Sequence, residues 1–289
     1  MSGFARWAGF SLALLLSVGF VAQARAEKTL LRVRLEGQVL ESPSDAAGLL
    51  ALFEDAQFKT LREYAQLIRS AAADRDIHGL ALILDEPQLN LAQVEELTAA
   101  LASFKAKNKP IYCYMDQAGN VTYPLAAAAT HITLAENSTL DIVGLYGQMM
   151  FFKGLLDKIG VEADMLHIGA YKSALEPFTR TEPSPEAAEN VNWLLDSIYE
   201  RWVQLIADGR KLSPEQVKKI VDTAPLTAAE ALEHKLVDAV GSFEDFQKAL
   251  RKEFGQDLTT VKSVEEMDAP DLKSDDIWGL LQKFQAFFE

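Results

Sequence analysis

The pattern of apolar positions in the first half of the chain predicts strands that alternate with helices. Residues 28–37 alternate between apolar and polar side chains, which is typical of a strand, and Gly37 ends the run. Residues 77–84 and 111–115 are too apolar to face water on either side, which indicates strands of a parallel sheet buried between helices. A short run at residues 131–135 predicts another strand.

Apolar residues at helical spacing separate these strands. They cover residues 60–73 and residues 90–107, where Asn90 can cap the helix, and an alanine-rich helix is expected over residues 123–130. Connections of this length allow right-handed crossovers between parallel strands, so the rhythm predicts an α/β domain.

The second half of the chain is expected to be mainly helical. An amphipathic helix is predicted over residues 148–159, a strand over residues 161–168 follows it, and residues 138–147 are expected to form a loop. A long helix over residues 184–208 carries many apolar residues, which suit either the core or a subunit interface. The last helix is expected over residues 243–254, and three earlier helices are expected to begin at capping residues: Ser184, Ser213 and Thr227.

The two ends of the chain differ from the unit between them. Residues 1–26 combine Arg6, an uncharged apolar run and small residues, which is the order of a secretory signal, so we expect either export or an N-terminal anchor. The α/β domain is expected over residues 27–255, followed by an acidic linker over residues 256–276. Residues 277–289 predict an apolar amphipathic tail that lies against a membrane, a partner or its own domain.

Composition narrows the classes of function. The net charge of −14 argues against nucleic acid as a partner, because phosphates repel an acidic surface. The single cysteine, Cys113, excludes an intrachain disulfide and is expected to be a small buried hydrophobic residue. The sequence has no zinc-spaced histidine pair or acidic cluster and no glycine-rich phosphate loop, so no cofactor or metal is expected.

One lysine is the main candidate for chemistry. Lys172 follows the apolar run at residues 165–168, and Pro177 shortly after it is expected to forbid a helix there. A lysine held on a loop among apolar neighbours can lose its proton because desolvation disfavours the ammonium, and the neutral amine can act as a general base. The alternative is a solvated surface lysine, which is the commoner case.

The residues around Lys172 resemble the lysine motif of the signal peptide peptidase SppA (protease IV) family, in Tyr171-Lys172-Ser173-Ala174 and Glu176-Pro177-Phe178. The resemblance covers about residues 28–255 and includes residues 152–161, 184–186 and 231–238. It implies a crotonase/ClpP-like α/β spiral of ββα units with a helical C-terminal arm. It also implies a membrane-associated serine peptidase with a Ser-Lys dyad, peptide substrates such as cleaved signal peptides, a periplasmic or membrane-anchored location, and a ring of subunits.

The serine that this family uses is missing from the matching stretch. In the family the serine opens a helix in a Ser-Gly-Gly-Tyr-like context, and residues 119–129 match that stretch here. Asn120 stands at the serine position, and Val121 stands where a glycine would let the backbone close on the substrate carbonyl. An asparagine amide cannot attack as a deprotonated hydroxyl does, so this chain alone is not expected to cleave peptides by that mechanism.

Other nucleophiles and bases are weaker candidates. Ser173 adjoins Lys172, but neighbours on an extended segment point to opposite faces, so Ser173 is not expected to reach the lysine amine. Ser138 and Thr122 lie nearer the expected site and remain candidates. A Ser-His-Asp triad is not indicated, because no histidine accompanies a Gly-x-Ser-x-Gly elbow, and His78 is expected to be a satisfied core residue. The other histidines are His131, His167 and His234.

The resemblance offers one way to reconcile a retained lysine with a missing serine. The long form of the family is a tandem whose N-terminal half supplies the lysine and whose C-terminal half supplies the serine, and this chain resembles the N-terminal half. We therefore expect Lys172 to be the general base of a composite site, with the serine on another domain or chain of a homo-oligomeric ring or hetero-assembly. A non-catalytic pseudo-protease scaffold or regulatory subunit is the alternative. A crotonase-like acyl-CoA enzyme ranks last, because CoA is not expected outside the cytoplasm.

Overall fold

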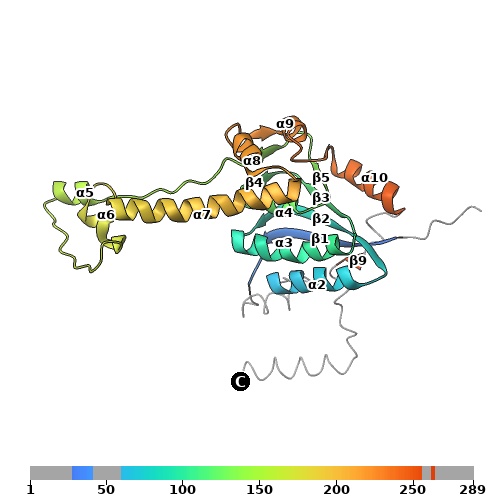
Figure 1. Cartoon of the computed structure of the whole chain (residues 1–289), viewed down its shortest axis with the longest axis horizontal. Coiled ribbons are helices and arrows are strands. Elements are labelled where there is room, and N and C mark those ends of the chain that lie inside the picture. The colour runs from blue at the N-terminus through green and yellow to red at the C-terminus, as the bar shows by residue number, and fades with distance from the viewer. Residues whose placement is uncertain (1–27, 42–59, 256–261, 264–289) are drawn as a thin grey trace, which may run out of the picture.

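Parallel strands form the central sheet of the molecule. The computed structural model describes residues 28–41, 60–255 and 262–263, and all neighbouring strands of its six-stranded sheet run parallel (Figure 1). The predicted parallel-sheet α/β architecture is therefore confirmed. The strand order is β8-β5-β3-β2-β1-β9, with bounds β1 Thr29–Gln38, β2 Ile77–Gln88, β3 Ile111–Met115, β5 His131–Leu134, β8 Ala239–Val240 and β9 Lys262–Ser263.

Helices pack on both faces of this sheet. Successive strand residues point to opposite faces, so Leu31 and Leu80 join the core formed with α2 (Leu61–Ala73) and α3 (Leu91–Ala106). Leu30 belongs instead to a smaller apolar cluster with α10 (Phe243–Phe254). β2 and β3 are buried on both sides, which is why residues 77–84 and 111–115 are nearly continuous apolar runs, whereas β1 alternates between buried and more exposed residues over most of its length.

Local hydrogen bonds start the helices where the sequence predicts. The capping side chain accepts a bond from the backbone N–H three residues later, which satisfies one of the otherwise unpaired donors of the first turn. The predicted caps are confirmed for α3, α7 (Pro185–Arg210), α8 (Pro214–Val221) and α9 (Ala228–Glu233) at Asn90, Ser184, Ser213 and Thr227, respectively.

A second, three-stranded sheet lies beside the main one. It is formed by β4 (Ala118–Gly119), β6 (Thr139–Asp141) and β7 (Leu226–Thr227), in the order β4-β6-β7. β6 falls within residues 138–147, which were expected to form a loop. Three residues are too few to show an alternating pattern, and the strand exists because it pairs with neighbours on both sides.

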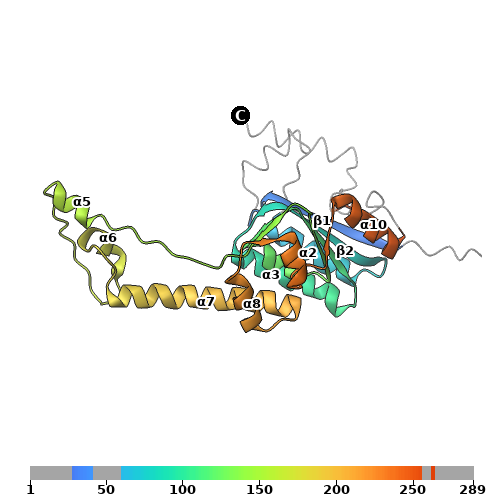
Figure 2. The ribbon, with the colours of Figure 1, turned by 90° about the horizontal axis from the view of Figure 1, so that it is seen from above.

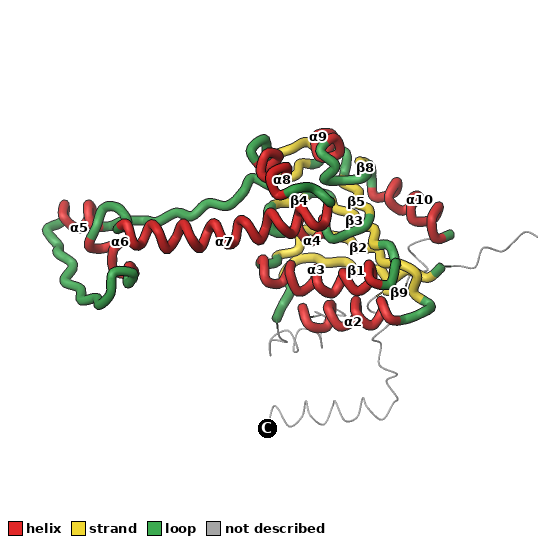
Figure 3. Tube along the Cα trace, viewed as in Figure 1, coloured by secondary structure: helices red, strands yellow, loops and turns green. Residues whose placement is uncertain are grey.

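Residues 143–184 leave the core and build an arm together with the first half of α7 (Figures 1 and 2). Figure 3 shows the chain running outward as a long loop to α5 (Lys153–Lys158) and returning along α7. The turn at the far end contains η1 (Ser173–Leu175) and α6 (Glu176–Thr179). Apart from Ala187 near its start, the buried residues of α7 lie at the end nearest the sheet: Trp202, Val203, Leu205, Ile206 and Ala207.

Four further sequence predictions about local structure are wrong. The strand expected over residues 161–168 is not formed, because within the described chain no strand lies beside it to complete its hydrogen bonds. The helix expected over residues 148–159 is limited to α5. Pro177 does not forbid a helix, since it lies in the first turn of α6, where a missing N–H costs nothing. His78 is exposed rather than part of the core.

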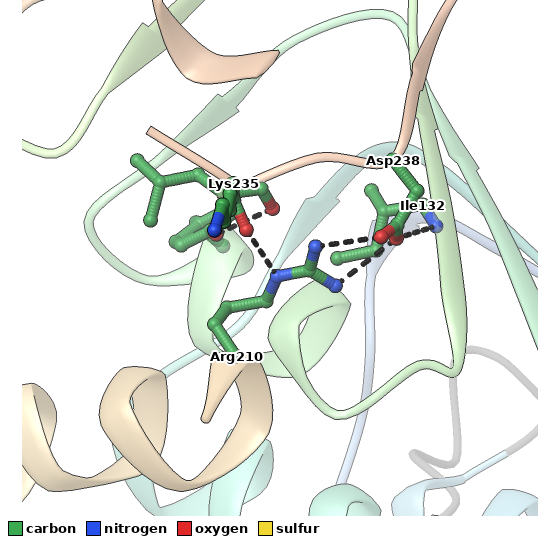
Figure 4. Close-up of polar contacts among 6 residues, drawn as sticks. Ile132, Arg210, Lys235 and Asp238 are labelled. Atoms are coloured by element: carbon green, nitrogen blue, oxygen red, sulfur yellow. Dashed lines mark hydrogen bonds and ion pairs between the residues drawn. The ribbon is translucent and has the colours of Figure 1, made fainter. Parts of the chain in front are cut away.

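An ion pair joins the end of α7 to the central sheet (Figure 4). Nη2 and Nη1 of Arg210 donate to the two carboxylate oxygens of Asp238 at 2.9 and 3.1 Å, and Nε donates to the Lys235 carbonyl at 2.9 Å. The backbone N–H of Ile132, in β5, donates to the same carboxylate at 2.8 Å. The Arg210 side chain is only 7% exposed, so this pair is an internal connection rather than a surface contact.

The predicted N-terminal signal or anchor, acidic linker and apolar tail lie outside the described residues, and their boundaries stay predictions. Of the helices that the structure describes, none combines the length and the apolar character needed to cross a bilayer.

Candidate active site

Asn120 lies in the turn between the edge strand β4 and α4 (Thr122–Ala127), which is where the family resemblance places the nucleophile. Its side-chain Nδ2 donates to the carbonyl oxygen of Gly144 at 2.6 Å. Its backbone carbonyl accepts a hydrogen bond from the indole Nε1 of Trp202 in α7. Asn120 therefore connects the core to both segments of the arm, the outgoing loop at Gly144 and the returning helix α7 at Trp202.

The groups around Asn120 are not arranged for nucleophilic attack. Its Oδ1 is buried without a hydrogen-bond partner among the described residues, and its amide nitrogen is bound to Gly144. The backbone N–H of Gly119 donates to Thr122 Oγ1 at 3.1 Å, so it is not free to stabilise an oxyanion. This turn positions the arm but offers neither a reactive hydroxyl nor, at Gly119, a free backbone donor.

Lys172 lies on the arm, directly before η1, and its side chain is exposed. Its backbone N–H donates to the Gly169 carbonyl at 3.1 Å, and Gly169 has a φ of +99°, which closes a tight turn. The expectation that apolar neighbours bury this lysine is wrong for the single chain. The strand that was expected to carry it is absent, and no other element of the described chain covers the arm.

Two side-chain contacts hold the turn that carries Lys172. The Glu176 carboxylate accepts hydrogen bonds from the hydroxyl and the backbone N–H of Ser184 at 2.5 and 2.8 Å, and these bonds hold the pKa of Glu176 below its usual range. The Tyr171 hydroxyl donates to Glu189 at 2.9 Å. The lysine thus projects from a turn that is fastened to the start of α7.

The structure does not bring Lys172 and Asn120 together. Glu176 binds Ser184 at the start of α7, whereas Asn120 binds Trp202, which lies eighteen residues further along the helix. At about 1.5 Å per residue these two anchor points are about 27 Å apart. Lys172 immediately precedes η1 beside α6, and Asn120 immediately precedes the turn into α4, and Figure 1 shows α6 and α4 at opposite ends of the arm.

No alternative catalytic pair replaces them within the described residues. Ser138 and Thr122 bond only to the backbone, no serine or threonine hydroxyl is bonded to a histidine or lysine, and no three metal-ligating side chains are grouped for a metal ion. Cys113 is fully buried, and burial raises the pKa of its thiol, which confirms its expected role as a small core residue.

Sequence reasoning missed how strongly apolar residues gather on the arm. Among the residues that the structure describes, all the exposed large hydrophobic side chains lie between residues 143 and 194, apart from Val121, Leu232 and Phe243. Leu166 and Ile168 are 95% and 92% exposed. An apolar surface of this extent is unusual for a protein that works as a monomer. The signal in the sequence is the run of apolar residues around residue 150, which by its spacing predicts only an amphipathic helix over residues 148–159.

Comparison with known proteins identifies the relatives of this chain. The model of peptidase family S49 matches residues 103–257. Protease 4 of Salmonella typhi is 31% identical over 247 residues, which are 78% of this chain and 39% of the relative. The chloroplastic serine protease SPPA of Arabidopsis thaliana is 26% identical over 196 residues, or 68% of this chain and 29% of the relative. The chain therefore matches less than half the length of either relative.

Among solved structures, the catalytic domain of the ClpP protease from Plasmodium falciparum is 10% identical, with a TM-score of 0.37 over 75% of this chain and 87% of that chain. At that score the likeness says nothing about activity or assembly.

Proposed function

Because the chain belongs to peptidase family S49, the family of protease IV and signal peptide peptidase SppA, we propose that it is the lysine-bearing part of a composite serine peptidase. In this proposal Lys172 is the general base, and the attacking serine comes from another domain or another chain. The observation that carries it is the residue at the nucleophile position, where the Asn120 amide is bonded to Gly144 and cannot attack a carbonyl.

The position of Lys172 supports a site shared between chains or domains. The lysine is exposed at the end of the arm, about 27 Å along α7 from the Asn120 turn, so a serine that accepts its help has to approach from outside this chain. The arm is long enough to carry the lysine away from its own core and present it to a neighbour.

The apolar surface of the arm supports the same arrangement. A neighbouring subunit or domain that covers Met150, Leu166 and Ile168 would remove exposed apolar area and exclude water from around Lys172. Water exclusion favours the neutral amine that a general base requires. We propose that the assembly is a ring of such arms, exported or membrane-anchored, that digests peptides such as cleaved signal peptides.

A second candidate function is a non-catalytic scaffold or regulatory subunit of the same assembly. It is favoured by Asn120, which serves as a structural link between the core, Gly144 and Trp202 rather than as a vacant catalytic position. In this alternative Lys172 is a solvated surface residue.

An activity-based label distinguishes the two. The tagged full chain is purified from its native source without denaturation and treated with a fluorophosphonate, which reacts with activated serines. The composite-site proposal expects a labelled serine on a co-purifying polypeptide or on a further domain. That label is lost in Lys172→Ala and kept in Lys158→Ala, a control that removes another exposed lysine of the arm.

The serine that carries the label distinguishes the composite site from the scaffold. Labelling that survives Lys172→Ala, or that maps to a serine of residues 28–255, would contradict the composite site. A stable assembly in which no serine is labelled would support the scaffold.

A further inference from the structure

A basic cavity lies at the edge of the central sheet where its strands begin. It has a volume of about 590 Å³ and lies between the C-terminal ends of α3 and α7 and the segments that lead into β3 and β5. Its lining contains four cationic side chains and one carboxylate: Lys105, Lys109, Arg210, Lys211 and Asp238. The cavity therefore carries a surplus of three positive charges in a chain whose net charge is −14.

Two of these cations already have structural partners. Lys109 Nζ donates to the carbonyls of Ala71, Ala72 and Asp74 at the C-terminal end of α2, so its three donors are used. Arg210 is held by Asp238, but its guanidinium has five N–H groups and only three take part in hydrogen bonds. Two N–H groups of the Arg210 guanidinium therefore have no partner among the described residues, and this side chain, which is 7% exposed, belongs to the lining of the cavity.

The other two cations have no partner of opposite charge. Within the described chain, neither Lys105 nor Lys211 forms a hydrogen bond or an ion pair through its ammonium. Burial, followed by the positive charges of Arg210 and Lys211, lowers the pKa of Lys105, which shows that these cations repel one another. A bound anion would relieve this repulsion.

Helix ends alone do not account for the surplus. Cations near a helix C-terminus offset the partial negative charge of its free carbonyls, and Lys105 and Arg210 lie in the last turns of α3 and α7. Each helix end carries about half a unit of negative charge, so the ends of α2, α3 and α7 together offset about half of the surplus. The Asp74 carboxylate near Lys109 is a further counter-charge, whereas Lys105 and Lys211 form no ion pair within the described residues.

We infer that this cavity is a binding site for a phosphate-class anion, held by the ammonium groups of Lys105 and Lys211 and the free N–H donors of Arg210. The anion is either a free phosphate or the headgroup of an acidic phospholipid. Guanidinium and ammonium groups that converge on one cavity are the usual recognition elements for phosphate oxygens. The site is separate from Lys172 and Asn120, so it does not depend on the proposed peptidase function.

The test uses the full chain and two double variants of equal charge. Lys105→Gln with Lys211→Gln removes the two unpaired ammonium groups, and Lys218→Gln with Lys219→Gln on α8 is the matched control. Isothermal titration with inorganic phosphate and with pyrophosphate is expected to show saturable binding to the wild type and to the control. The cavity variant is expected to bind these anions at least about tenfold more weakly than the wild type, since two unit charges near the anion are lost.

Folding and the source of the anion are checked separately. Without added anion, the cavity variant is expected to unfold at the same temperature as the wild type or higher, because mutual repulsion among the cations is reduced. Sedimentation with phosphatidylglycerol vesicles, with phosphatidylcholine vesicles for comparison, shows whether a lipid headgroup is the source.

If the cavity variant loses binding to phosphatidylglycerol vesicles, the anion is a phospholipid headgroup. If it loses binding to the soluble anions but vesicle binding does not depend on Lys105 and Lys211, the anion is a free phosphate. The inference is overturned if the wild type binds neither probe, or if the cavity and control variants bind equally well.

Discussion

Asp238 holds the end of α7 on the central sheet, and replacing it with asparagine isolates the charge in that contact. The carboxylate accepts two hydrogen bonds from Arg210 and one from the backbone N–H of Ile132. Asparagine keeps the shape and can still accept from Ile132. Its NH₂ group, however, would face an Arg210 nitrogen, so two donors would meet and the guanidinium would lose its counter-charge.

The structure sets the size of the effect. At separations of 2.9 and 3.1 Å and an effective dielectric constant of about 20, the attraction between the two groups is about 5 kcal/mol before the cost of removing them from water. Breaking a buried pair by removing one partner costs about 3–5 kcal/mol. Because the Asp238 side chain is 31% exposed, solvent weakens the pair, and we expect Asp238→Asn to lower the free energy of unfolding by about 2–3 kcal/mol.

Urea unfolding followed by Trp fluorescence at several pH values measures this effect. Burial by itself raises the pKa of Asp238, but the hydrogen bonds from Arg210 and Ile132 and the charge of Arg210 together hold that pKa below its ordinary value. A carboxyl group whose pKa is depressed by folding stabilises the folded state above the unfolded pKa of about 3.9, and this contribution disappears as the pH falls further. The difference between wild type and Asp238→Asn should therefore be full at pH 7 and shrink below about pH 4.

Asp196→Asn is the matched control, since Asp196 is exposed on α7 without a hydrogen bond or ion pair in the described structure, and it should change stability by less than about 0.5 kcal/mol. The reasoning is refuted if Asp238→Asn costs no more than this control at pH 7. It is equally refuted if the cost stays constant down to pH 3.

Two further substitutions test how α7 is attached to the core. A Cβ at Gly209 would lie 2.3 Å from the Ala127 carbonyl oxygen, so Gly209→Ala should force α7 away from α4 and lower the free energy of unfolding in urea by about 2–3 kcal/mol. Gly154→Ala is the control, because a Cβ there meets nothing within 4 Å, and it should not lower the free energy of unfolding. Equal losses for the two variants would contradict the close approach of α7 to α4. Trp202→Phe removes the indole N–H that donates to the Asn120 carbonyl, and it should lower the free energy of unfolding by about 1–3 kcal/mol. An unchanged midpoint in thermal or urea unfolding would show that this hydrogen bond does not hold the arm.

Much of the core could be predicted from the sequence because the signals are local or nearly so. A capping residue such as Asn90, Ser213 or Thr227 bonds to a backbone group three positions away, and a strand buried on both faces has to be apolar along its length. The parallel α/β architecture follows from these two signals and the length of the connections. The asparagine at position 120 could likewise be identified directly, because its side chain has no hydroxyl group wherever the fold places it.

The tertiary structure decided the course of residues 143–184. Apolar alternation over residues 161–168 predicts a strand, but a strand also needs a neighbour to pair with, and the described chain places none there. The same absence leaves Lys172 exposed rather than buried, and about 27 Å of helix separates its turn from Asn120. Residue spacing determines which groups meet within one turn of helix, whereas burial and pairing depend on partners that the spacing does not specify.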